Sequence, residues 1–162
     1  MPKLFLFLVA LLVAAIPSQA VLAADTIFVM RHLQKAEGND PPLSPEGAAN
    51  AKALADLLAR SGIKAIFATP TRRAMETAAP LAARLGIKVT SYDAANPGAL
   101  VSAVAAIPGS VLVVGHSNTV PDLVARFGGK QPVTLTEQDY GTLFAVTHDD
   151  GNVTQIKIQH TP

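Results

Sequence analysis

The sequence predicts an α/β fold, a three-layer sandwich whose mainly parallel central sheet is flanked by helices and followed by a C-terminal β-hairpin. Three observations favour it. Strand-like and helix-like stretches alternate along residues 26–127, as in parallel sheets with crossover helices. The stretch "SVLVV" at Ser110–Val114 is apolar without a break, as strands buried on both faces are. Two β-rich stretches near the end of the chain enclose "HDDGN", which is a hairpin turn signal.

The individual elements follow from periodicity and from their stop signals. The β-favouring run Thr26–Met30 is the first strand. A helix is predicted over Pro45–Ser61, because Ser44 is a good N-cap, proline suits the first turn and Gly62 suits the stop. The remaining strands are predicted at Lys64–Ala68, Lys88–Ser91, Ser110–Val114, Gly141–Thr147 and Val153–Gln159, and the remaining helices at Thr71–Leu85, Pro97–Ala106 and Thr119–Phe127.

Residues 1–23 match a secretory signal peptide and are excluded from the predicted fold. Lys3 carries the early positive charge, an apolar run of 13 residues follows, and the small residues of "SQAVLAAD" suit a cleavage site. The apolar run is shorter than the roughly 20 residues of a membrane-spanning helix. An uncleaved membrane anchor is the alternative. Cleavage after Ala23 or Ala24 would leave one domain, residues 24–162, that is periplasmic or secreted and not stably inserted in a membrane.

Composition excludes several classes of function. The chain has no cysteine, which excludes disulfides, zinc–thiolate sites and thiol catalysis. Without Lys3, the 13 basic residues become 12 and balance the 12 acidic ones. A neutral domain carries no electrostatic footprint for nucleic acid or an anionic membrane, so neither is expected as a partner.

Charged residues and imidazoles follow the predicted strands where a ligand site in such a sheet belongs. Arg31 and His32 follow the first strand, Asp93 the third and His116 the fourth, while Arg73 begins a helix. The carboxyl ends of parallel strands meet at one edge of the sheet, so these side chains are expected to converge. Fixed cations stabilise the charge of a phosphoryl transition state, and a neutral imidazole can act as its nucleophile. The pattern therefore favours phosphoryl transfer. No H-E-x-x-H or Walker-type loop is present, and neither a metal nor a cofactor is expected.

Four segments of the chain together resemble one enzyme family. They read "FVMRHLQKAE", "PPLSPEGAANAKALADLL", "TPTRRAMETA" and "LVVGHSN". The family is the histidine phosphatase superfamily, with its phosphoglycerate-mutase-like fold. The resemblance implies that His32 is the nucleophile that becomes phosphohistidine, and that Arg31, Arg73 and His116 bind the phosphoryl group. The chain resembles the compact branch, which favours hydrolysis of small phosphate monoesters or phosphoprotein over mutase activity.

Two residues depart from the family pattern, and the proton donor is not part of a motif. Leu33 stands where the signature has glycine and is expected to narrow the pocket, and Glu76 stands where glutamine is usual. Asp93 is the first candidate for the general acid and Glu37 the second; a turn-capping role is the alternative for Asp93. These departures leave a second hypothesis open, a degenerate member that binds phosphate or another anion and turns over poorly.

Overall fold

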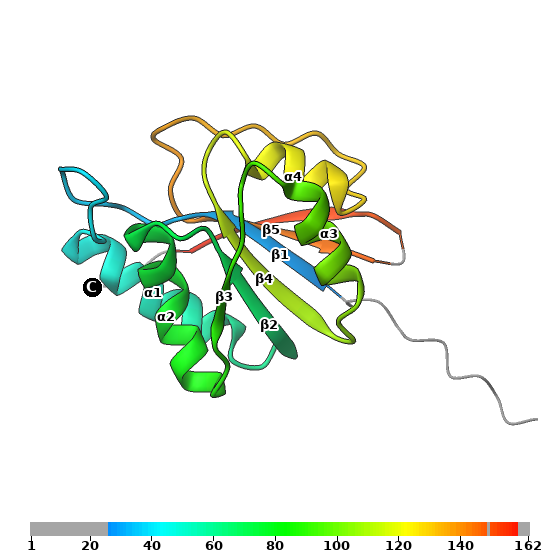
Figure 1. Ribbon diagram of the computed structural model, residues 1–162, viewed down its shortest axis with the longest axis horizontal. Helices are drawn as coiled ribbons and strands as arrows, with labels where there is room; N and C mark the ends of the chain where they lie inside the picture. The colour runs from blue at the N-terminus through cyan, green and yellow to red at the C-terminus, as the bar shows by residue number, and fades with distance from the viewer. Residues whose placement is uncertain (1–25, 149, 159–162) are drawn as a thin grey trace, which may run out of the picture.

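The computed structural model describes residues 26–148 and 150–158, which form a six-stranded sheet in the order β3-β2-β4-β1-β5-β6 (Figure 1). The predicted signal peptide, residues 1–23, lies outside the described residues. All ten predicted elements are present, with boundaries shifted by three residues at most, as where α1 ends at Leu58 rather than Ser61. The strands are β1 (Thr26–Arg31), β2 (Ile63–Ala68), β3 (Val89–Ser91), β4 (Ser110–Gly115), β5 (Thr142–Thr147) and β6 (Val153–Lys157), and the helices are α1 (Pro45–Leu58), α2 (Arg72–Leu85), α3 (Pro97–Ala105) and α4 (Val120–Arg126).

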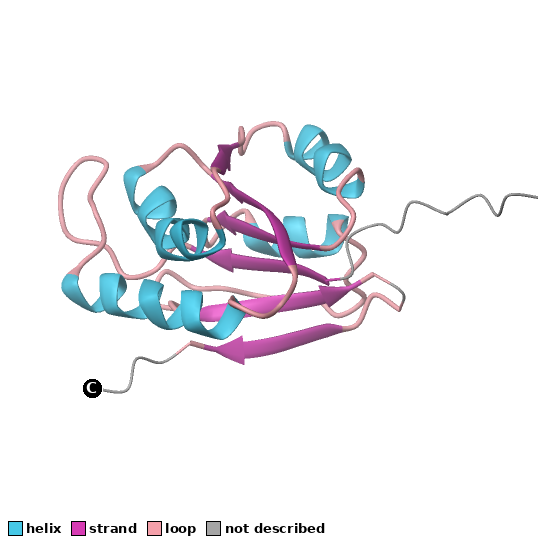
Figure 2. Cartoon of the chain, turned by 90° about the horizontal axis from the view of Figure 1, so that it is seen from below, coloured by secondary structure: helices cyan, strands magenta, loops and turns pink. Residues whose placement is uncertain are grey.

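The sheet has a parallel part and an antiparallel part. Strands β3, β2, β4 and β1 run parallel to their neighbours, and crossover helices join them. Strand β5 pairs antiparallel with β1, and β6 pairs antiparallel with β5 as the C-terminal hairpin (Figure 2). The predicted mainly parallel sheet with a terminal hairpin is therefore confirmed.

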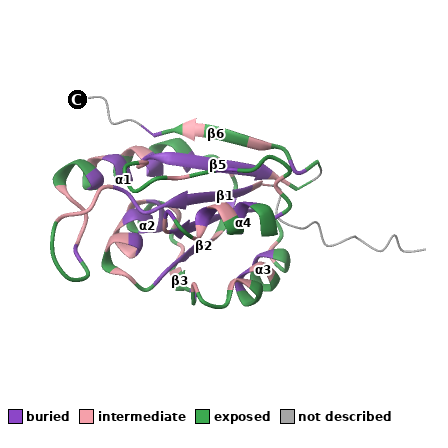
Figure 3. Ribbon diagram, turned by 90° about the horizontal axis from the view of Figure 1, so that it is seen from above, coloured by how far each residue is buried: buried purple, intermediate pink, exposed green. Residues whose placement is uncertain are grey.

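Helices cover both faces of the sheet and make three layers. One core packs α1 and α2 against side chains such as Met30, Leu112 and Leu143. The other packs α3 and α4 against Val29, Val113 and their neighbours. The central strands are buried on both faces, whereas β6 at the edge is largely exposed (Figure 3). This explains why the central strands read as continuous apolar runs.

Among the described residues, no helix combines the length and the apolar character needed to cross a bilayer.

The register of the sheet determines which residues lie together at the site. Arg31 on β1 lies opposite Gly115 on β4, so the residues that follow these strands, His32 and His116, leave the sheet side by side. The N–H of Thr69, directly after β2, donates to the carbonyl of β4 residue Val114 at 3.2 Å. The carboxyl ends of three adjacent strands thus form one row, which is where ligands bind in sheets of this kind.

Candidate functional site

A cavity of about 380 Å³ opens at this row, within the size range of small-molecule sites. Its lining residues are Arg31, His32, Lys35, Arg73, His116, Ser117, Asn118 and Glu137. Four of the five predicted site residues are therefore brought together, and the fifth, Asp93, is not among them. The expected convergence of the two histidines and two arginines is present in the structure.

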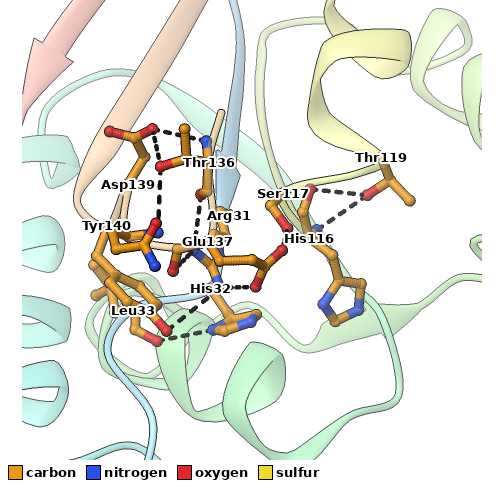
Figure 4. Close-up of polar contacts among 11 residues, drawn as sticks. Arg31, His32, Leu33, His116, Ser117, Thr119, Thr136, Glu137, Asp139 and Tyr140 are labelled. Carbon is orange, nitrogen blue, oxygen red and sulfur yellow. Dashed lines mark hydrogen bonds and ion pairs between the residues drawn. The ribbon is translucent and has the colours of Figure 1, made fainter. Parts of the chain in front are cut away.

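The His32 ring is oriented by the backbone around it. Its main-chain N–H donates to the Gly115 carbonyl at 2.9 Å, which holds the residue against the end of β4. Its Nδ1 lies 2.8 Å from the Leu33 carbonyl oxygen (Figure 4). Because a carbonyl oxygen can only accept, Nδ1 donates, and the neutral ring keeps its lone pair on Nε2. The His116 ring stands edge-on to it, with the ring centroids 5.4 Å apart.

Both histidines are held in the neutral form. Burial lowers the pKa of His32 from 6.5 to about 4, against the hydrogen bond to Leu33, which favours the charged form. The charges of Arg31 and Arg73 lower this pKa further. Burial also lowers the pKa of His116, followed by the same two arginines. A neutral imidazole is the nucleophilic form, so the site is poised for attack on an electrophile at neutral pH.

The lowered pKa of His32 predicts that stability falls as the pH falls. Between about 4 and 6.5 the unfolded chain binds this proton and the native chain does not, so acidification favours unfolding. The difference corresponds to up to about 3 kcal/mol, present in full above pH 6.5 and lost toward pH 4. Urea unfolding from pH 4 to 7.5 measures the slope. The slope should flatten in His32→Gln, and an unchanged slope would contradict this account.

Arg31 is buried, and the segment 136–140 holds its guanidinium. Its Nη1 donates to the carbonyls of Thr136 at 3.2 Å and Glu137 at 2.7 Å. Its Nη2 donates to the Glu137 carboxylate at 2.9 Å and to the Tyr140 hydroxyl at 3.3 Å. The ring of Tyr140 lies under it, 4.1 Å from Cζ. Its Nε is buried and has no partner among the described residues, so one donor is left for a ligand.

Arg73 belongs to the first turn of α2. Its Nη1 lies 3.6 Å from the Asp40 carboxylate, and its Nε is also buried without a partner in the described part of the chain. Asp40 also accepts from the N–H of Arg72 at 2.9 Å, and Glu76 accepts from the N–H of Leu43 at 2.7 Å. These bonds fasten the loop before α1 to the start of α2. Glu76 only has to accept here, which explains why a carboxylate can replace the expected glutamine amide.

Leu33 does not narrow the cavity, and that expectation was wrong. Its side chain is fully buried in the core between the sheet, α1 and α2, and it is not among the residues that line the cavity. Its N–H donates to the Thr77 hydroxyl at 3.0 Å, and that hydroxyl donates to the Arg73 carbonyl at 2.8 Å. These bonds tie the end of β1 to α2 and turn the leucine inward, so the bulk of the side chain does not face the site.

The N-terminal part of α1 supports the loop that begins at Gln34, directly after Leu33. The Gln34 carbonyl accepts from Ser44 at 2.9 Å, and the Asn50 amide donates to the Gln34 side chain at 3.1 Å. A Cβ on Gly47 would lie 2.0 Å from the Gln34 carbonyl oxygen, so only glycine permits this approach. The glycine of the "SPEG" stretch therefore supports the backbone on which His32 depends.

Asp93 lines a neighbouring cavity of about 440 Å³ that shares His116 with the first. It follows β3, at the edge of the sheet, three strand spacings or about 14 Å from β1. Its side chain is exposed and accepts from the Ala95 N–H at 2.9 Å, as a turn-capping aspartate does. Glu37 is exposed and lines neither cavity. Asp93 can therefore meet only a ligand that extends past His116.

Sequence reasoning missed Glu137 and Ser117. Glu137 is the acidic residue in the cavity lining, and its carboxylate accepts from both the Arg31 guanidinium and the Ser117 hydroxyl. The Ser117 hydroxyl, just beyond β4, is directed to this carboxylate. The bond from Ser117, and then the charge of Arg31, lower the pKa of Glu137. No local signal in residues 129–140 indicates this contact, which joins residues 106 positions apart.

Within residues 26–148 and 150–158, no group of three or more His, Cys, Asp or Glu side chains is arranged to hold a metal ion.

Comparison with known proteins finds a family model that matches part of the chain and a set of similar folds. The model of the histidine phosphatase superfamily (branch 1) matches residues 27–95. Over 47 residues the chain is 55% identical to Rv0525, an uncharacterized protein of Mycobacterium tuberculosis. The matched part is 29% of this chain and only 23% of the length of that relative.

Solved structures share the fold at low sequence identity. The protein histidine phosphatase SixA complexed with tungstate is 24% identical, with a TM-score of 0.63 over 81% of this chain and 94% of that one. The mycobacterial glucosyl-3-phosphoglycerate phosphatase Rv2419c with inorganic phosphate is 19% identical, with a TM-score of 0.62 over 84% and 98%. YhfR of Bacillus stearothermophilus is 16% identical, with a TM-score of 0.63 over 85% and 98%. These are likenesses of fold.

Proposed function

We propose that the chain is a phosphatase of the histidine phosphatase superfamily, whose model matches residues 27–95, and that it hydrolyses phosphate monoesters or phosphoprotein through a phosphohistidine at His32. Arg31, Arg73 and His116 bind the transferred phosphoryl group. The reaction needs no metal ion, and its substrate is a small phosphorylated molecule or a phosphorylated protein. Relatives in fold include enzymes named for both kinds of substrate, SixA as a protein histidine phosphatase and Rv2419c as a glucosyl-3-phosphoglycerate phosphatase.

The reaction proceeds in two displacements. The lone pair on His32 Nε2 attacks phosphorus, the N–P bond forms, and the P–O bond of the ester breaks as the leaving oxygen takes up a proton. Water then attacks phosphorus, the N–P bond breaks with its electron pair returning to Nε2, and orthophosphate departs. The proton lost by the water replaces the one used in the first step. The guanidinium groups stabilise the negative charge on the equatorial oxygens in both transition states.

The observation that carries this proposal is a neutral, oriented imidazole beside unsatisfied cationic donors. The Nε2 of His32 is left free because Nδ1 is engaged by the Leu33 carbonyl. The Nε groups of Arg31 and Arg73 are buried without partners among the described residues, which costs free energy unless a ligand supplies acceptors. A tetrahedral phosphoryl group has enough oxygens to satisfy both arginines at once.

Phosphoryl labelling tests the proposal directly. The protein is mixed with a ³²P-labelled phosphate monoester, quenched within milliseconds in alkaline denaturant, and analysed for phosphohistidine. We expect label on His32, formed at the rate of turnover or faster and unaffected by chelators. Turnover without a labelled intermediate, or turnover abolished by a chelator, would overturn the mechanism. Retention of phosphate without turnover would instead favour the anion-binding alternative.

Asp93 is proposed as the proton donor for substrates that reach into the cavity on its side of His116. Asp93→Asn should slow hydrolysis of alkyl phosphates by roughly 100-fold, the usual scale of general acid catalysis. Aryl phosphates, whose leaving group needs no proton, should be slowed little. Steady-state kcat/KM for the two classes measures this. The same loss on both would assign Asp93 to turn structure and make Glu37 the next acid to test.

Export is also proposed, on the signal-like residues 1–23. We expect the native protein to begin at Ala24 or Asp25 and to be recovered from the periplasm or the medium. N-terminal sequencing of protein purified from fractionated cells tests this. Recovery from the cytoplasm with Met1 retained would contradict it.

A further inference from the structure

The carboxylate of Glu137 lies in the cavity and is held by two of the residues that line it. Its carboxylate accepts from Nη2 of Arg31 at 2.9 Å on one side and from the Ser117 hydroxyl on the other (Figure 4). Arg31, Ser117 and Glu137 all line the cavity that also contains His32. A carboxylate held by a guanidinium and a hydroxyl reproduces the contacts that two oxygens of a phosphate would make.

Hydrogen bonds hold the turn that carries Glu137, but the carboxylate itself is exposed to solvent. The 136–140 turn that carries it is held by Asp139, which accepts from the N–H and the hydroxyl of Thr136 at 2.7 and 2.8 Å. The side chain of Glu137 nevertheless remains 71% exposed, whereas that of Arg31 is only 2% exposed. Solvent thus reaches the carboxylate but not the guanidinium beneath it. A rotation of the Glu137 side chain alone would free one N–H of Nη2, whose other partner is the Tyr140 hydroxyl. The turn would stay folded, because the backbone bonds from Arg31 do not depend on that side chain.

We propose that Glu137 is an internal anion that occupies the phosphate subsite of the free protein and is displaced by the phosphoryl group of the substrate. The inference rests on the proposed function of this cavity. Displacement makes the residue a determinant of specificity: a ligand must outcompete a carboxylate, which favours a dianionic phosphoryl group over a singly charged anion. Phosphate can bind only in the fraction of molecules in which Glu137 has moved away, and its apparent affinity falls by that fraction.

The charge of Glu137 persists at neutral pH. The Ser117 bond and the Arg31 charge lower the pKa of Glu137, so the carboxylate competes over the whole range in which phosphate monoesters are dianionic. Among the described residues, Lys35 and Arg73, the other lysine and arginine of the cavity, form no hydrogen bond or ion pair with Glu137, although the charge of Lys35 also lowers the pKa of this carboxyl. Both cations remain for the ligand.

Removal of the charge of Glu137 tests the inference. We expect Glu137→Gln, which keeps size and shape, to bind inorganic phosphate about tenfold more tightly than the wild type in calorimetric titration, the gain expected when a tenth of molecules are competent. Asp56→Asn is the matched control: it removes one negative charge from an exposed pair with Arg84 outside the cavity, and its affinity should stay at the wild-type value. In the wild type, the Glu137 carboxyl ¹³C signal should shift when phosphate saturates the site.

The outcomes separate this inference from the proposed function. Equal or weaker phosphate binding by Glu137→Gln, or a carboxyl signal unmoved at saturation, overturns the internal anion while a labelled His32 leaves the phosphatase intact. Tighter binding by the variant without any labelled intermediate supports the internal anion and counts against catalysis. If neither protein binds phosphate, both are overturned.

Discussion

Replacement of His32 by alanine is expected to abolish turnover and the labelled intermediate together. No other described side chain presents a neutral imidazole nitrogen in the same position, because the Nε2 of His116 is engaged with the Thr69 hydroxyl at 2.9 Å. Loss of an enzyme nucleophile costs on the order of 10⁵- to 10⁶-fold in kcat. Single-turnover assays with an aryl phosphate can measure a loss of this size.

His148→Ala is the matched control for the His32 substitution. His148 is exposed and does not line the cavity, so its loss should leave kcat unchanged. His32 is only 2% exposed, so thermal unfolding must show that the His32 variant is folded. Full activity in a folded His32 variant would mean that another group attacks phosphorus. Retained phosphate binding in that variant would show that the arginines bind without the nucleophile.

The strands and the chemistry of the site could be predicted because their signals are local. Apolar runs locate β1 and β4, and in a parallel sheet the residues that follow adjacent strands share an edge. That reasoning alone predicts that Arg31, His32 and His116 lie together. Arg73 is predicted to join them because it lies in the "TPTRRAMETA" motif, at the start of a helix.

The direction of a side chain just beyond a strand could not be predicted. Leu33 breaks the strand alternation because its N–H is held by Thr77 on α2. That bond sets the backbone path and turns the leucine into the core. The partner lies 44 residues away, so nothing near Leu33 in the sequence indicates it.

The order of the strands limits what the sequence can say about the proton donor. Asp93 was predicted at the rim, and it is there, but β3 lies at the edge and β1 near the middle of the sheet. Strand order is determined by tertiary packing, so the distance between Asp93 and the end of β1 could not be predicted from the sequence. Glu137 was not predicted at the site, although it lies there. It belongs to a polar segment without periodicity, and only the tertiary structure places this segment beside Arg31.

Replacement of Arg73 by alanine is expected to lower kcat/KM by 10²- to 10³-fold, the scale on which removal of one donor to transition-state charge acts. The Arg73 side chain is only 20% exposed, and although its Nη1 lies 3.6 Å from Asp40, its Nε lacks a partner among the described residues and can donate to a ligand. Most of the loss should appear in kcat, because the guanidinium binds the charged phosphoryl oxygens more strongly in the transition state than in the substrate. Steady-state kinetics with one alkyl and one aryl phosphate measure kcat and KM separately.

Arg72 offers the control on the same turn of α2. Its side chain is 59% exposed and pairs with Glu76, so Arg72→Ala removes an equal charge from the helix start without touching the cavity lining. We expect less than a threefold change, since exposed ion pairs contribute little. Arg73→Lys should recover only part of the activity, because an ammonium keeps the charge but not the planar fork. Equal losses in the Arg72 and Arg73 variants would mean that the charge at the helix start matters rather than a specific contact. Full activity in Arg73→Lys would leave charge, and not paired hydrogen bonds, as the contribution of this residue.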